Sequence, residues 1–362
     1  MKGTRGLRAL LLLAMAIPSL AIAHSGWAEQ VETWAEPPWA ARLEARLALL
    51  EAGFDGELGV HVRDLETGAR HGWRDAEPWY LASLVKVPVA IELMSRVEAG
   101  ELRLEERLTL ARGDYVDGAG PTNWSAPGSA LRLRQLLESM LIVSDNTASD
   151  MLIRRVGLDA VNDRVRRLAP SGGVGPITTL VDVRRHAYSH LHPAAFDMSG
   201  MDFIELRKHQ GERARLAWFR RRLDLNSQEL LSPSIDEAFR RYYATDLNSG
   251  RLDAYAELLA ALAQGRALGP DATAELLAVM SRTTSGARRL KAGFGGEVRF
   301  AHKTGTQHRL ACDAGIATRG AGAEARRLVI VACVRGELDL GRNEQMLAAV
   351  GRAVREAGAF EG

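Results

Sequence analysis

The chain has very little lysine. Of its 47 lysine and arginine residues only five are lysine, namely Lys2, Lys86, Lys208, Lys291 and Lys303. Arginine carries charge as well as lysine does, but it is not deprotonated in a protein and therefore cannot act as a base. Two of the five lysines fall in short motifs described below. At Lys86 the motif indicates a need for an amine that can lose its proton, which arginine could not supply.

Strong net charge is also absent. The formal net charge is +2 at pH 7, so the electrostatics of the whole molecule favour neither nucleic acid nor an anionic membrane as partner, and a small-molecule substrate fits better. No internal repeat or low-complexity stretch is found in the sequence. The 362 residues are enough for a large core, in one broad domain or two interleaved ones.

Cysteine is nearly absent, since the chain has only Cys312 and Cys333. Two cysteines alone are a weak basis for a metal site. Both lie in apolar runs on either side of the turn Gly320-Ala321-Gly322, so a hairpin could bring them side by side. A disulfide and two buried free thiols both remain open, because the register of such a hairpin is not given by the sequence.

Long apolar runs are missing except near the start. Lys2, Arg5 and Arg8 precede an apolar run over 9–22 and the small-x-small pattern Ala21-Ile22-Ala23. This arrangement predicts a cleaved signal peptide over 1–23, an exported (periplasmic) protein, and no membrane span in the mature chain 24–362. A membrane anchor is the alternative, but the run is short and Pro18 interrupts it.

The remaining pattern predicts an α/β protein of the α+β type. Alternating residues predict strands over 57–63, 69–74, 297–303, 310–318 and 327–335. Helical periodicity predicts helices over 39–52, 83–97, 131–141, 147–156 and 343–357. Sheet parts at about 39–80 and 290–357, with a helical part at about 81–289 between them, imply one antiparallel sheet split by helices.

Three short motifs stand in order along the chain: Ser83-Leu84-Val85-Lys86, Ser144-Asp145-Asn146 and Lys303-Thr304-Gly305. Together they describe an acyl-transferring serine active site. A serine hydroxyl is a weak nucleophile until a neighbouring base takes its proton. A lysine one helical turn later lies on the same face and can be that base if burial keeps its amine neutral. Ser83 is the predicted nucleophile and Lys86 its base.

On these motifs the chain resembles the class A β-lactamases and the wider group of penicillin-recognising serine enzymes, from Trp39 to Ala357 apart from one segment. The resemblance implies a β-lactamase/transpeptidase-like fold, with an antiparallel five-stranded sheet flanked by helices and an inserted all-helical subdomain. It also implies that Ser144 relays a proton to the leaving nitrogen. The catalytic residues expected from it are Ser83, Lys86, Ser144 and Lys303.

The same resemblance implies the substrate contacts. Lys303 and Thr304 face the substrate carboxylate, for which a cation and hydroxyls are suited, and Asn146 holds the substrate side-chain amide and the ammonium of Lys86. The backbone N–H groups of Ser83 and Thr306 stabilise the charge that develops on the carbonyl oxygen. The substrate-binding residues expected are Asn146, Thr304, Gly305, Thr306 and Arg309. Arg309 is a possible second charge for the carboxylate, and a solvated loop arginine is the alternative.

One departure from the family pattern stands out. Class A enzymes carry a glutamate on a loop after the second motif, where it activates the hydrolytic water, and its sequence context is missing here. An expanded loop insertion at about 181–244 occupies this place. The acids in it that remain open as a replacement base are Glu205, Glu229, Asp197 and Asp202.

The same segment holds His186, His190 and His192. The spacing of the first two puts them on one helix face, so that with His192 and Asp197 they could bind zinc and activate a water. Helix caps and loop contacts are the other use of such histidines. The serine mechanism itself requires no cofactor.

The function predicted from the sequence is a serine β-lactamase-type hydrolase that opens β-lactam antibiotics through a Ser83 acyl-enzyme. A D-alanyl-D-alanine peptidase acting on cell-wall peptide, and a penicillin-binding protein that is acylated without turnover, are the alternatives. The sequence does not give the preferred β-lactam class or the oligomeric state.

Overall fold

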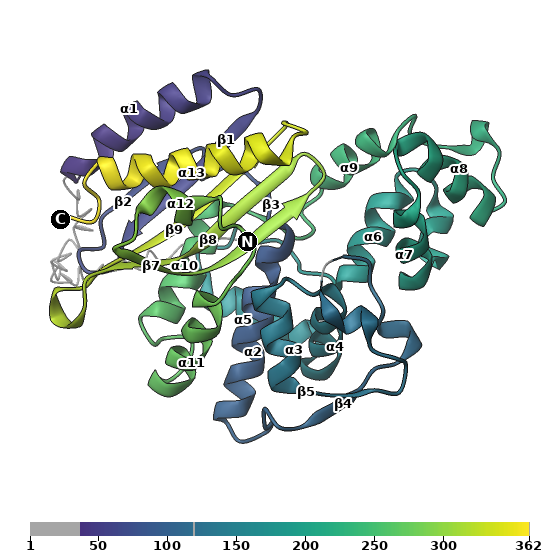
Figure 1. The fold of residues 1–362 in the computed structure, drawn as a ribbon, viewed down its shortest axis with the longest axis horizontal. Coiled ribbons are helices and arrows are strands. Elements are labelled where there is room, and N and C mark those ends of the chain that lie inside the picture. Colours follow the sequence, from purple (N-terminus) through teal and green to yellow (C-terminus); the bar gives the residue numbers. More distant parts are fainter. Residues whose placement is uncertain (1–36, 119, 362) are drawn as a thin grey trace, which may run out of the picture. The chain divides into compact units, whose positions relative to one another are not determined.

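The computed structural model describes residues 37–118 and 120–361. Strands from both ends of the chain join in one antiparallel sheet with the order β2-β1-β9-β8-β7 (Figure 1). The strands are β1 (Glu57–Asp64), β2 (Arg70–Trp73), β7 (Val298–Gln307), β8 (Leu310–Arg319) and β9 (Arg326–Arg335). The predicted fold class is confirmed, whereas the predicted signal peptide, residues 1–23, lies outside the described residues.

Both faces of the sheet are buried, as the alternation along β9 shows. The even-numbered residues 328–334 pack into a core shared with α1 (Pro38–Ala52), α12 (Leu290–Phe294) and α13 (Leu340–Glu356). The odd-numbered residues 329–333 pack into the core on the other side of the sheet. Since successive side chains of a strand point to opposite faces, the sheet is the middle of three layers. Figure 1 shows α1 and α13 together on one face.

The other face is covered by helices gathered around α2. Residues Lys86 to Met94 of α2 are all buried, as expected for a helix that is apolar nearly all round. The helices of this layer are α2 (Lys86–Glu98), α3 (Leu133–Ile142), α4 (Asn146–Val156), α5 (Leu158–Leu168), α10 (Leu252–Ala263) and α11 (Pro270–Ser281). Two short antiparallel pairs join them: β3 (Trp79–Tyr80) with β6 (Ser249–Gly250), and β4 (Arg107–Thr109) with β5 (Ala130–Arg132).

Besides the helix predicted to begin at Ser83, whose α-helical part begins at Lys86, two element ends differ from the sequence prediction by three residues or more. The strand predicted to stop at Lys303 continues as β7 to Gln307, because Lys303 to Thr306 pair with Ala314 to Ala311 of β8. The closing helix begins three residues before its predicted start, where the Asp339 side chain accepts a hydrogen bond from the N–H of Arg342. The first difference matters for the site, since it places the third motif inside a strand.

The insertion segment, residues 181–244, folds into helices around an aromatic core. Its helices are α6 (Leu180–Ser189), α7 (Gly200–Lys208), α8 (Glu212–Arg222) and α9 (Ile235–Tyr243). Tyr188 lies at the centre of that core, with ring centroids 5.6, 5.8 and 5.9 Å from those of Phe203, Phe219 and Phe239. Each of these four side chains comes from a different helix, so the core holds the segment together.

Buried polar side chains fix the two ends of the insertion segment. Asp150 of α4 accepts hydrogen bonds from the N–H groups of Leu180 and Val181, at 2.6 and 2.9 Å, and so caps the first turn of α6. Asn248 accepts from the N–H of Thr178 at 3.0 Å and donates to the Thr178 hydroxyl at 2.8 Å. The two ends of the insertion segment are therefore held next to each other by the hydrogen bonds between Thr178 and Asn248.

Cys312 and Cys333 form a disulfide between directly paired residues of β8 and β9. This resolves the choice that the sequence left open. None of the helices in the described part of the chain has the length and apolarity that crossing a bilayer requires.

Candidate active site

The turn that carries Ser83 is held against strand β7. After β3 the chain forms a short 3-10 helix, Ala82–Val85, which runs directly into α2. Gly305 makes the close approach possible, because a Cβ at this position would lie 2.8 Å from the Leu81 carbonyl oxygen and 3.1 Å from the Cβ of Ala82. The Ser83 hydroxyl faces the cavity described below and makes no hydrogen bond with any described residue. It is therefore free to meet a ligand.

Lys86 is fully buried and contacts the second motif. Its Nζ donates to the Ser144 carbonyl oxygen at 2.6 Å, to the Ser144 hydroxyl at 3.1 Å and to Asn146 Oδ1 at 2.7 Å. Three acceptors match the three donors of an ammonium. The structure thus joins Lys86, Ser144 and Asn146 as expected, but in this state Lys86 makes no hydrogen bond to Ser83. Hydrogen bonds between catalytic groups are often absent without substrate and form with it.

Lys303 approaches the same hydroxyl from the sheet. Its Nζ donates to Ser144 Oγ at 2.9 Å and to the Thr304 carbonyl oxygen at 2.8 Å. Ser144 has a φ of 63°, an uncommon value outside glycine, and it sets this hydroxyl between the two amines. Burial, with the charges of Lys86 and Arg289, lowers the pKa of Lys303 well below its ordinary value. A proton can therefore pass between the Lys86 and Lys303 amines through the Ser144 hydroxyl.

Burial also lowers the pKa of Lys86 to about 7, although the Asp145 and Asp150 carboxylates oppose the shift. A lysine acts as a base only when neutral, so the active fraction rises with pH through this pKa and is complete above it. We expect the rate of Ser83 acylation by a penicillin at limiting concentration to rise up to about tenfold per pH unit below 7 and to level off above it. Stopped-flow acylation rates between pH 5.5 and 9 test this; a flat profile would contradict it.

The end of the site at Thr304 and Thr306 is built from hydroxyls and a buried arginine. Thr304 Oγ1 lies 2.6 Å from Ser285 Oγ. Arg289 donates to Thr306 Oγ1 at 2.7 Å and to the carbonyl oxygens of Gly305 and Cys312, both at 2.9 Å. Sequence reasoning missed Arg289 and Ser285, since neither belongs to a motif or a periodic pattern. Arg289 fixes the strand that carries Thr304 and Thr306.

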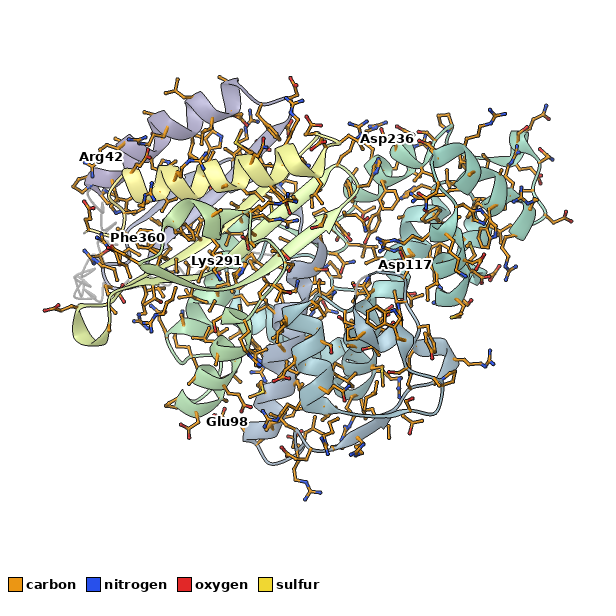
Figure 2. The ribbon with its side chains drawn as sticks, in the orientation of Figure 1. Arg42, Glu98, Asp117, Asp236, Lys291 and Phe360 are labelled. Carbon is orange, nitrogen blue, oxygen red and sulfur yellow. A yellow bond between two sulfur atoms is a disulfide. The ribbon has the colours of Figure 1, made fainter. Side chains whose placement is uncertain are left out.

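Arg309 lies elsewhere than expected. It ends up in the β7–β8 turn, where its guanidinium contacts Asp236 of α9 at 2.5 Å and the Gly336 carbonyl oxygen at 2.9 Å. It does not line the cavity. His308 contacts the same carboxylate at 2.6 Å, so Asp236 ties the insertion segment to the sheet (Figure 2). Arg309 therefore helps to hold the insertion segment against the sheet.

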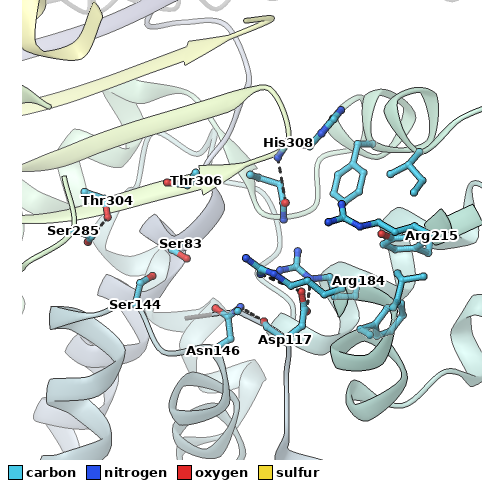
Figure 3. Close-up of a pocket in the computed structure, with 18 of the residues that line it drawn as sticks. Ser83, Asp117, Ser144, Asn146, Arg184, Arg215, Ser285, Thr304, Thr306 and His308 are labelled. Atoms are coloured by element: carbon cyan, nitrogen blue, oxygen red, sulfur yellow. Dashed lines mark hydrogen bonds and ion pairs between the residues drawn. The ribbon is translucent and has the colours of Figure 1, made fainter. Parts of the chain in front are cut away.

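A cavity of about 450 Å³ opens in front of Ser83. The motif region supplies hydroxyl and amide groups to its wall, and the insertion segment supplies arginines and apolar side chains (Figure 3). The residues that line it are Ser83, Asp117, Gly118, Val143, Ser144, Asn146, Arg184, Tyr188, Phe203, Leu206, Arg207, Arg215, Ile235, Phe239, Ser285, Thr304, Thr306, Gln307 and His308. Thus the insertion segment is a wall of the cavity.

Among the described residues that line the cavity, Asp117 is the one carboxylate. Its Oδ1 accepts from Arg184 Nε at 2.6 Å, and its Oδ2 lies 3.6 Å from an Arg207 nitrogen. Both oxygens of this carboxylate thus face guanidinium groups. It lies at the boundary with the insertion segment, and no motif or periodic pattern in the sequence marks it.

The four acids considered as a replacement base do not line the cavity. Glu205 pairs with Lys208 at 2.6 Å, and Asp202 pairs with Arg222 at 2.6 Å. Glu229 accepts from the N–H of Asn226 at 2.7 Å. Asp197 ends a short 3-10 helix over 193–197. The contacts of the first three are those of surface ion pairs and helix caps.

The histidines of the insertion segment do not converge. His186 lies edge-on to Phe196, with ring centroids 5.1 Å apart, while His192 Nδ1 accepts from the N–H of Ala194 at 3.2 Å. His190 follows directly after α6. Within residues 37–118 and 120–361 no group of three histidine, cysteine or acidic side chains is arranged to hold a metal ion. The cap at His192 is the alternative use that the sequence left open.

Comparison with known proteins agrees with this geometry. The model of the Beta-lactamase enzyme family matches residues 42–357. A β-lactamase of Rhodobacter capsulatus is 31% identical over 123 residues, which are 34% of this chain and 41% of that protein. A β-lactamase of Mycobacterium tuberculosis is 26% identical over 270 residues, covering 74% of this chain and 70% of that protein. The match to the Rhodobacter capsulatus protein thus spans less than half of that protein's length.

Among solved structures, a β-lactamase from Xanthomonas campestris pv. campestris superimposes with a TM-score of 0.66 at 23% identity. The superposition covers 90% of this chain and 99% of that one. At this identity the likeness establishes the shared fold.

Proposed function

The chain belongs to the β-lactamase enzyme family, and on that premise we propose that it is a serine hydrolase that opens β-lactams through an acyl-enzyme on Ser83. The observation that carries the proposal is the arrangement of two buried amines around one hydroxyl, beside a free serine hydroxyl in a cavity. Lys86 and Lys303 lie 3.1 and 2.9 Å from Ser144 Oγ, and Ser83 lines the same cavity.

In the proposed acylation, Ser83 Oγ attacks the lactam carbonyl carbon while neutral Lys86 takes its proton. The N–H groups of Ser83 and Thr306 receive the charge on the carbonyl oxygen. The C–N bond then breaks, and the proton passes from Lys86 through the Ser144 hydroxyl to the lactam nitrogen. The product is an ester of Ser83 with an opened ring, and no cofactor takes part in these steps.

Lys303, Thr304, Ser285 and Thr306 form the proposed site for the ligand carboxylate. The low pKa of Lys303 reflects its burial beside other cations, and an incoming carboxylate favours its charged form. Asn146 Oδ1 accepts from Lys86, and one hydrogen of its Nδ2 bonds the Asp117 carbonyl oxygen at 2.6 Å. The second hydrogen of Nδ2 is the proposed donor to the carbonyl oxygen of the ligand side-chain amide.

Hydrolysis of the ester requires a base that takes a proton from the attacking water. We propose that this hydrolysis is the slow step. Among the described residues that line the cavity the only carboxylate is Asp117, held by Arg184. The same observation favours a second candidate function, a penicillin-binding protein that is acylated with little turnover. We assign no step to zinc, because no three histidine, cysteine or acidic side chains in the described part of the chain are arranged to hold it.

We further propose that the protein is exported to the periplasm. Its first 23 residues have the charge and apolar pattern of a signal peptide. The Cys312–Cys333 disulfide also suits an oxidising compartment.

Mass spectrometry of the intact protein, followed over time after mixing with a penicillin, tests the proposed function. We expect an adduct of one whole penicillin to form within minutes, to map to the peptide that contains Ser83, and to decay more slowly than it forms. An adduct that never decays would replace the hydrolase with the second candidate. No adduct and no hydrolysis of a chromogenic cephalosporin, with release of D-alanine from a D-alanyl-D-alanine peptide, would favour a peptidase.

A further inference from the structure

The wall that the insertion segment gives to the cavity is unusually basic. Arg184, Arg207 and Arg215 line the cavity, against the single carboxylate of Asp117. Three guanidinium groups against one carboxylate leave an excess of two positive charges, as large as the net charge of the whole chain. A cleft lined with such an excess favours an anionic ligand.

The three arginines are not equally engaged. Arg184 is mostly buried and satisfied by Asp117, at 2.6 Å. Arg207 is farther from the same carboxylate, at 3.6 Å, and its side chain is 60% exposed. Arg215 is half-buried and donates through Nε to the His209 carbonyl oxygen at 3.0 Å, but its two terminal nitrogens make no hydrogen bond or ion pair with any described residue. Arg215 therefore presents unused donors to the cavity.

These donors lie at the end of the cavity opposite the carboxylate site. Figure 3 shows Arg184 and Arg215 across the cavity from Ser285 and Thr304, with Ser83 between them. A ligand with its ring carboxylate at Thr304 and its carbonyl at Ser83 has its acyl side chain directed away from Thr304. That side chain would run past apolar residues such as Leu206 toward the arginines.

We propose that the insertion segment selects acyl donors whose side chain carries a second acidic group, with Arg215 as its main contact and Arg207, which lines the same cavity, as a second cation. A guanidinium group with both terminal nitrogens free matches the two oxygens of a carboxylate. The ligand class is thus dianionic: one carboxylate binds at the hydroxyl end of the cavity and another at the arginine end. This inference rests on the proposed acylation of Ser83.

The test compares two penicillins that differ by one group, benzylpenicillin and α-carboxybenzylpenicillin. We expect the second to acylate Ser83 about tenfold faster at limiting concentration, which corresponds to one charge-assisted contact of about 1.4 kcal/mol. In Arg215→Ala the ratio of the two rates falls about tenfold, and in Arg215→Glu it falls below one. The preference of the wild-type protein also weakens as salt is raised.

Arg213→Ala is the matched control, because Arg213 is an exposed residue of the same helix α8 and does not line the cavity. It should keep the wild-type ratio. Formation of the benzylpenicillin adduct reports that each variant is folded. Equal rates for the two penicillins, or a ratio that Arg215→Ala leaves unchanged, would overturn this inference alone. Failure of both penicillins to form an adduct would overturn the proposed function and this inference with it.

Discussion

Ser83→Ala is expected to form no covalent adduct with a penicillin and to lose hydrolysis of a chromogenic cephalosporin by at least about ten-thousandfold. The loss is large because the hydroxyl supplies the new bond itself. Ligand binding should survive, since the hydroxyls and amines at the carboxylate end are untouched. Intact-protein mass spectrometry gives the adduct, and a shift of the thermal midpoint with ligand gives the binding.

The other serines of the cavity make this experiment decisive. Ser144 lies between two amines, and Ser285 contacts Thr304 at 2.6 Å, so either could be taken for the nucleophile. Ser285→Ala is the matched control, because it also removes one cavity hydroxyl; it should still form the adduct, with a rate reduced by about tenfold or less. An adduct in Ser83→Ala would mean that another residue is acylated.

The sheet and its motifs could be predicted from the sequence because their signals are local. Alternation of apolar residues marks β8 and β9, which lie between two cores. The end of β7 could not be predicted in the same way, since Lys303, Thr304 and Thr306 do not alternate in polarity. Pairing with β8 makes these residues a strand, and that pairing is a tertiary effect.

The motif residues of the site were also accessible from the sequence, whereas their partners were not. Lys86, Ser144 and Lys303 meet through contacts across 58 and 159 positions of chain. Arg289 donates to backbone carbonyl oxygens, and Asp117 pairs with Arg184. Neither contact can be predicted from the spacing of residues in the sequence. For Arg309 the sequence left a substrate contact and a solvated loop arginine open, and the structure places it in the turn, where it contacts Asp236.

The insertion segment shows the limit of such reasoning most clearly. The spacing of His186 and His190 indicates a helix in it, but the direction of its side chains depends on how the hydrogen bonds between Thr178 and Asn248 place the segment. Candidate acids could therefore be named but not ranked. The structure places arginines, rather than these acids, in the cavity wall.

Lys86→Arg is expected to lower the rate of Ser83 acylation by about a thousandfold, although it keeps a positive charge at the same position. The reason is that a guanidinium does not give up its proton in a protein. The only carboxylate among the described cavity-lining residues is bound to Arg184. The other buried amine, Lys303, contacts the Ser144 hydroxyl from the opposite side at 2.9 Å, and any rate that the variant retains measures what this amine contributes. A rate within tenfold of the wild-type protein would show that the proton of Ser83 leaves by another path.

Two further measurements separate chemistry from folding in this variant. Lys208→Arg is the matched control: Lys208 pairs with Glu205 on the surface of α7, and its replacement should leave acylation unchanged. Because Lys86 is fully buried, a larger guanidinium can also disturb packing. Lys86→Ala leaves space instead, and added methylamine should then restore part of the acylation rate, more strongly as the pH approaches the pKa of the added amine. Rescue of this kind reports a missing base, because an amine in solution does not repair a misfolded site.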